Sequence, residues 1–67
     1  MYLDLVEYLR EQGYSDIRIV EVKEKYLKML VDGRIVEVKK KDNIVLVRAY
    51  LIDPRLGFAV WKFFATP

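Results

Sequence analysis

The segment Arg18-Ile-Val-Glu-Val-Lys-Glu-Lys25 returns sixteen positions later as Arg34-Ile-Val-Glu-Val-Lys-Lys-Lys41, and the two copies differ only where Lys40 replaces Glu24. Both copies are rich in β-branched residues, which favour strands. A chain that runs along one strand, turns and comes back needs roughly this length before an equivalent strand begins. The repeat therefore predicts an antiparallel sheet in which the two copies are equivalent strands.

Two tight turns fix how the copies pair. Asp32-Gly33 is typical of a two-residue hairpin turn with positive φ, and this turn sets Lys28 opposite Glu37. A tight turn at Glu24-Lys25 sets Glu21 opposite the same lysine. Both copies are thus predicted to flank one central strand, with Lys28 between the two repeated glutamates.

The flanking segments complete an α+β fold. Residues 2–12 carry an apolar stripe at helical spacing and are followed by Gly13, which favours a helix end. We therefore expect a single domain, residues 1–67, in which an N-terminal helix packs on one face of a five-stranded antiparallel meander sheet. This sheet is either open or curled toward a small barrel. Its strands are predicted at about 17–23, 26–31, 34–40, 44–52 and 58–65.

Two assignments have an alternative. A turn at Asp42-Asn43 is expected before the fourth strand, although a turn at Lys40-Lys41 would shift that strand by an even number of residues. Asp53-Pro54 is also typical of a helix start, with Asp as N-cap and Pro at the first position. We expect a strand over 58–65 because Gly57 would otherwise lie inside a helix.

One sheet face is predicted to form the core against the helix, while the second face is also rich in apolar residues. A contiguous apolar patch on a monomer is seldom larger than a few hundred Å². The second face should therefore either close on itself in a curled sheet or bind a partner, and we expect a homodimer. The predicted interface residues are Ile19, Leu30, Ile35, Tyr50, Val60 and Phe58.

Nucleic-acid binding is the alternative function. Three lysines cluster at a hairpin tip, and basic and aromatic residues lie near them, as in proteins that bind single strands. A lysine cluster at a turn is also common simply because it is solvated. The candidate residues are Lys39, Lys40, Lys41, Arg48 and Lys62, with Tyr26, Tyr50, Phe58 and Phe64 as stacking aromatics.

Composition indicates a non-enzymatic protein. The chain has no Cys and no His, and Ser15 has no evident base, so we predict no catalytic, metal or cofactor site. Glu21 and Glu37 each precede a lysine as in Glu-x-Lys nucleases, but neither has a companion acid near enough to share a metal. The high charge content with few uncharged polar residues resembles proteins of hot environments. A cytoplasmic location without a membrane span is expected.

Overall fold

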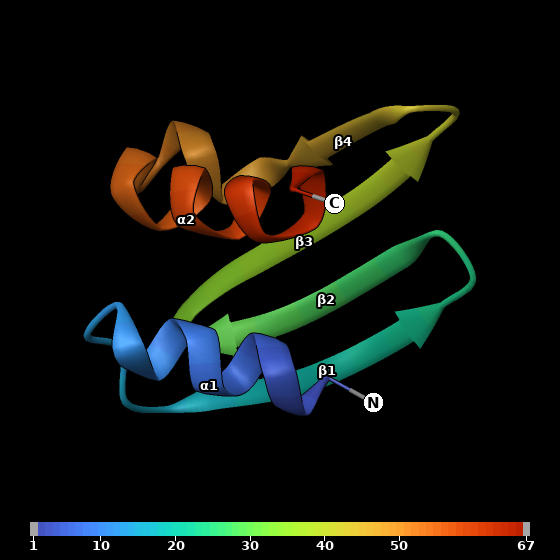
Figure 1. Cartoon of the computed structure of the whole chain (residues 1–67). Coiled ribbons are helices and arrows are strands. Elements are labelled where there is room, and N and C mark those ends of the chain that lie inside the picture. Colours follow the sequence, from blue (N-terminus) through green and yellow to red (C-terminus); the bar gives the residue numbers. More distant parts are fainter. Residues whose placement is uncertain (1, 67) are drawn as a thin grey trace.

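The computed structural model describes residues 2–66, and for Tyr50 and Leu51 it describes only the backbone. The fold is α+β, with two helices on the same face of one antiparallel sheet of strand order β1-β2-β3-β4 (Figure 1). In chain order the elements are α1 (Leu3–Glu11), β1 (Ile17–Lys23), β2 (Tyr26–Val31), β3 (Arg34–Lys41), β4 (Ile44–Val47), the 3-10 helix η1 (Arg48–Leu51) and α2 (Pro54–Ala65).

The predicted N-terminal helix is confirmed, together with the way it ends. Gly13 has a φ of 103°, which is the left-handed conformation that glycine adopts readily. The chain then folds back, so that the Tyr14 amide donates to the Leu9 carbonyl at 3.0 Å. This cap directs the chain from α1 into β1 and buries Tyr14 in the core.

The central pairing of the repeat is also confirmed. Lys28 lies opposite Glu21 on β1 and opposite Glu37 on β3, as the turn chemistry predicts. Asp32 has a φ of 49° and Gly33 a φ of 81°, so both turn residues are in the left-handed region. The two copies of the repeated segment therefore flank β2.

The first half of β1 departs from the predicted alternation because the strand contains a β-bulge. Ile19 lies opposite Met29 and Glu21 opposite Lys28, so Val20 is an extra residue with no partner of its own. On the N-terminal side of the bulge, side chains lie on the face opposite to the one that simple alternation predicts. Ile17 and Ile19 lie on the helix-covered face, although we predicted Ile19 in the interface of the second face, whereas Val20 lies on the opposite face.

The C-terminal part of the chain differs most from the prediction. The turn at Asp42-Asn43 is correct and Val38 lies opposite Val47, but β4 ends there instead of continuing to residue 52. Residues 58–65 belong to α2, so the predicted fifth strand is wrong. The sheet has four strands and two free edges rather than a closed barrel.

Capping and burial together explain why α2 forms. The Asp53 carboxylate accepts a hydrogen bond from the Leu56 amide at 3.2 Å, and Pro54 occupies the first turn. Helical spacing places Leu56 and Val60 on one side, where both are completely buried. These gains offset the cost of Gly57 within the helix, which is about 1 kcal/mol relative to alanine.

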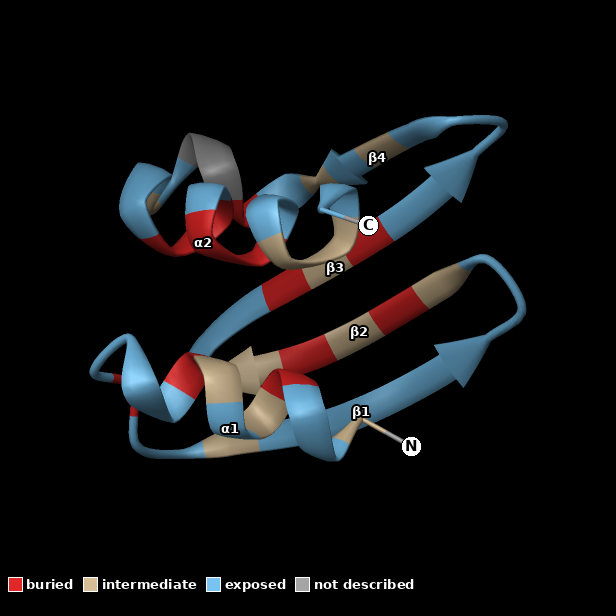
Figure 2. Ribbon diagram, viewed as in Figure 1, coloured by how far each residue is buried: buried red, intermediate tan, exposed pale blue. Residues whose placement is uncertain are grey.

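The core lies between the helices and one face of the sheet, as the red bands of Figure 2 show for α1, α2 and the two central strands. Leu5 and Leu9 of α1 meet the central strands on one side, and α2 contributes its own buried residues on the other. The largest fully buried side chains are Leu5, Leu9, Met29, Val31, Val36, Leu56 and Val60. Within residues 2–66, all apolar packing by the helices is thus on one face, and no helix covers the other face.

Candidate functional site

Because both helices cover the same side, the side chains that alternate to the other side of the sheet form a second surface, which we call the open face. Strand pairing assigns its members, and Arg48 of η1 reaches its rim through a contact with Glu37. The open face consists of Arg18, Val20, Glu21, Lys23, Tyr26, Lys28, Leu30, Ile35, Glu37, Lys39, Lys41, Ile44, Leu46 and Arg48.

The open face is strongly basic. It holds six basic and two acidic side chains, a formal charge of +4, whereas the whole chain has +2. The excess is balanced mainly by α1, which has three acidic residues and one basic residue. The charges of the molecule are therefore separated between the sheet and the first helix.

Both acids of the open face already have partners within the molecule. The Glu21 carboxylate lies 3.2 Å from the Lys23 ammonium. Glu37 accepts a hydrogen bond of 2.5 Å from the Tyr26 hydroxyl and lies 3.5 Å from the Arg48 guanidinium. Both acids are thus held by cations of the same face, and the net charge of +4 is carried by the remaining basic residues, Arg18, Lys28, Lys39 and Lys41.

The contact between Tyr26 and Glu37 changes the acidity of both groups. The hydrogen bond raises the pKa of Tyr26 to about 12, since loss of the proton would remove the donor beside a carboxylate. The same hydrogen bond lowers the pKa of Glu37, and the nearby Arg48 charge acts in the same direction. Glu37 therefore stays ionised and Tyr26 stays neutral over the physiological pH range.

Aliphatic side chains lie between these charges. Val20, Ile35 and Leu46 are 53%, 54% and 54% exposed. At one end of the face, Leu46 and Lys39 border a shallow hollow of about 240 Å³ whose other walls are Glu37, Val47 and Arg48. A ligand on the open face would meet apolar contacts and cations together.

The structure separates the residues of the predicted apolar interface. Leu30 and Ile35 lie side by side on the open face as expected. Val60 is completely buried in the core, and Phe58 lies on α2, because residues 54–65 are helical. Ile19 lies on the helix-covered face beyond the bulge, and the side chain of Tyr50 lies outside the described residues.

The predicted nucleic-acid residues are also divided between the two sides. Lys39 and Arg48 lie on the open face, where Lys41 accompanies them. Lys40 alternates to the helix side, and its ammonium lies 5.5 Å from the centre of the Phe64 ring. Lys62 is exposed on α2. Of the aromatic residues with described side chains, Tyr26 is the one on the open face.

Sequence reasoning missed several members of the open face. Val20 could not be assigned without knowledge of the bulge. Ile44, Leu46 and Lys23 follow from the register alone once the Asp42-Asn43 turn is accepted, and they are found by alternation from Lys39 and Tyr26. No sequence motif marks these residues, and they are identified by their alternation along the paired strands.

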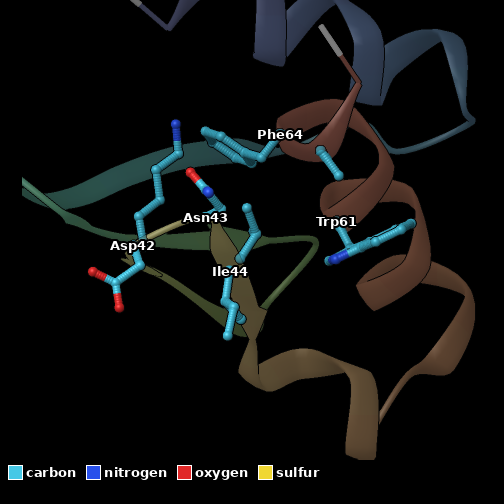
Figure 3. A pocket seen from close by; sticks show the side chains of 8 residues that line it. Asp42, Asn43, Ile44, Trp61 and Phe64 are labelled. Carbon is cyan, nitrogen blue, oxygen red and sulfur yellow. The ribbon is translucent and has the colours of Figure 1, made fainter.

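A hollow of about 490 Å³ lies on the other side of the sheet, between the β3–β4 hairpin and α2. Phe64 projects from α2 toward the hairpin in Figure 3, and Trp61 lies one turn earlier on the same helix. Val45 forms the strand side of the hollow, and Ile44, whose side chain alternates to the open face, borders it at the hairpin end. Its walls are mainly apolar, and the charges present are those of Lys40 and Asp42.

No helix within residues 2–66 is long and apolar enough to cross a membrane. The same part of the chain contains no group of three acidic side chains that could together hold a metal ion. Comparison with protein-family models, with curated proteins and with solved structures found no match to this chain.

Proposed function

We propose that the protein is a non-enzymatic binding module whose open face holds single-stranded nucleic acid. The observation that supports this proposal is the +4 charge of a sheet face that has no helix over it. Phosphate groups attract such a surface over several ångströms, and the attraction does not depend on sequence.

The arrangement of free cations fits an extended polyanion. Within residues 2–66, Lys28, Lys39 and Lys41 form no ion pair, so their ammonium groups are available to phosphates. Ile35 and Leu46 lie on the same face and offer apolar contact to unstacked bases. The half-buried ring of Tyr26 adds one aromatic surface, although its hydroxyl is engaged with Glu37.

The same charge argues against the face-to-face homodimer that the sequence predicts. Two open faces placed against each other would bring +4 against +4, and like charges across an interface cost free energy. The apolar row that motivated that dimer is also incomplete, because Val60 is in the core. An anionic partner would be attracted rather than repelled by this charge and would not need a complete apolar row.

The proposal is tested with a fluorescently labelled oligothymidylate and fluorescence anisotropy at several salt concentrations. We expect binding that weakens linearly on a log–log plot against salt. Replacing Lys39 and Lys41 together with alanine should reduce the magnitude of the salt slope by about 1.4, at about 0.7 per phosphate contact.

A matched control removes the same charge elsewhere. Lys25 lies in the β1–β2 turn and Lys62 on α2, and both are exposed. The Lys25→Ala, Lys62→Ala protein has the same net charge as the test variant but an intact open face. Equal weakening by both pairs would mean that only net charge matters, and absence of binding at low salt would refute the proposal outright.

A further inference from the structure

The two free edges of the sheet differ in how well they are protected against pairing with another strand. β1 has a bulge at Val20 and carries Arg18, Glu21 and Lys23, which are features that keep edge strands from pairing with other chains. β4 has the sequence Ile44-Val-Leu-Val47, with no charged residue, no proline and no irregularity in its register. Only the β4 edge is therefore open to a further strand.

The backbone groups that β4 offers can be identified from the hydrogen bonds of its neighbour. The Lys40 amide donates to the Lys25 carbonyl at 3.0 Å, so the backbone of Lys40 faces β2 and that of Lys39 and Lys41 faces β4. Their partners Leu46 and Ile44 face β3 in return. Val45 consequently directs its amide and carbonyl groups to the free edge, and Val47 directs its amide there.

The Val45 groups at this edge make no backbone hydrogen bond outside the strands within the described chain, whereas Val47 is the N-cap of η1 and its carbonyl belongs to the first turn of that helix. Within residues 2–66, the backbone hydrogen bonds of turns, loops and caps include none from Val45, and those in the segment after β4 begin at Ala49. In Figure 1 no other element runs along the outer side of β4, since α2 crosses the face of the sheet and not its edge. Four consecutive apolar residues with β propensity thus form a template for another strand.

We propose that β4 pairs antiparallel with β4 of a second copy of this chain, around a two-fold axis at Val45. The two four-stranded sheets then become one continuous sheet, with all helices on one side and the two open faces joined on the other. This self-association differs from a face-to-face dimer and does not depend on nucleic-acid binding.

The residues beside β4 are complementary to themselves in this register. With Val45 opposite Val45 of the second copy, Ile44 lies opposite Leu46 and the positions of Asp42 and Arg48 face each other at both ends. Both Asp42 and Arg48 are exposed, and Arg48 is 75% exposed. A register centred on Leu46 would instead place Arg48 opposite Ile44, so charge favours the axis at Val45.

The same asymmetry between edges explains why assembly would stop at two copies. After β4 has paired, both remaining edges of the joined sheet are β1 strands. These carry the bulge and the charges, so a third copy finds no receptive edge. A closed dimer is therefore expected rather than a fibre.

Sedimentation velocity of the full chain over a range of micromolar concentrations tests the proposal. We expect twice the monomer mass of 8.0 kDa at the upper end of the range. Val45→Pro removes the outward amide while leaving the hydrogen bonds to β3, and it should sediment as a monomer. Val45→Thr keeps the amide and the branched shape, so it should remain a dimer.

A second variant covers the case in which the proline substitution disturbs the fold. Leu46→Lys adds a charge at an exposed position of the edge strand, should leave the monomer folded by circular dichroism, and should also abolish the dimer. In the wild type, the Val45 amide should exchange with solvent at least about tenfold more slowly than in Leu46→Lys. A monomeric wild type, a dimer that survives both variants, or an unprotected Val45 amide would each overturn the proposal.

Discussion

Glu37 is the residue on which the polar contacts of the open face converge. It recurs as Glu21 in the repeated segment, and both glutamates lie opposite Lys28, yet only Glu37 has a tyrosine close enough to donate to it. The difference arises from position in the sheet, since Glu21 is on an edge strand. Identical sequence context thus gives two glutamates with different hydrogen-bond partners.

The substitution Tyr26→Phe should change how Glu37 titrates. Without the hydroxyl donor, the pKa of Glu37 should rise toward its usual value, because the hydrogen bond that stabilises the ionised carboxylate is gone. Carbon-13 NMR of the side-chain carboxyl measures this directly. Tyr14→Phe, which alters a tyrosine away from Glu37, is the control and should leave the titration unchanged.

The same pair makes the stability of the fold depend on pH in two windows. The pKa of Tyr26 is raised from 10.0 to about 12, so its contribution is complete below pH 10 and is lost as pH rises toward 12. The pKa of Glu37 is lowered, so its contribution is present above its usual pKa and is lost as pH falls through the folded value. Urea unfolding at high pH should show a smaller loss for Tyr26→Phe than for the wild type.

The assignment of faces predicts a large loss of stability for one substitution on β2 and a small loss for another on β3. Met29 is completely buried under the helices, so Met29→Ala should lower the free energy of unfolding by about 2 to 5 kcal/mol. Ile35 is on the open face, and Ile35→Ala should cost less than about 1 kcal/mol. Urea denaturation of both variants checks this difference, and similar losses would mean that the open face is buried in solution.

At the scale of elements, the start of α2 decides whether the C-terminal segment is a helix. Asp53 caps the helix and also lies 3.3 Å from the Arg34 guanidinium. Asp53→Ala should destabilise the protein by about 1 kcal/mol in urea denaturation. Asp53→Asn keeps the cap but not the charge, so it should retain most of the stability, and equal losses would assign the effect to the ion pair instead.

The repeated segment and its turns were sufficient to predict the centre of the sheet. Asp32-Gly33 determines its own register locally, and so Lys28 could be placed between Glu21 and Glu37 without any tertiary information. The bulge at Val20 could not be foreseen in this way. It depends on how an edge strand meets its neighbour and leaves no signal in a run of alternating residues.

The C-terminal helix was misassigned because one residue outweighed a clearer pattern. Gly57 argues against a helix by propensity, but propensity is weak beside burial and capping. Asp53 with Pro54 and the helical spacing of Leu56 and Val60 were the better signals. This error also displaced two predicted interface residues, so the candidate site was predicted less well than the fold.

For the molecule as a whole, a small core makes stability sensitive to any partner. A chain of 67 residues buries only about 60% of its unfolded surface, so binding that favours the folded state should be visible in melting. If β4 pairs as proposed, the melting temperature should rise with protein concentration. Differential scanning calorimetry of the wild type and of Leu46→Lys checks this, because the variant should melt at a temperature independent of concentration.

The separation of charge between α1 and the open face gives the molecule a permanent electric dipole across its thickness. In the field of a long polyanion, such a dipole turns the molecule before contact, so that most encounters begin with the sheet foremost. The benefit is kinetic and is confined to distances of about a Debye length, roughly 8 Å at physiological ionic strength. The acids of the first helix would therefore help to orient the molecule during its approach while touching nothing that is bound.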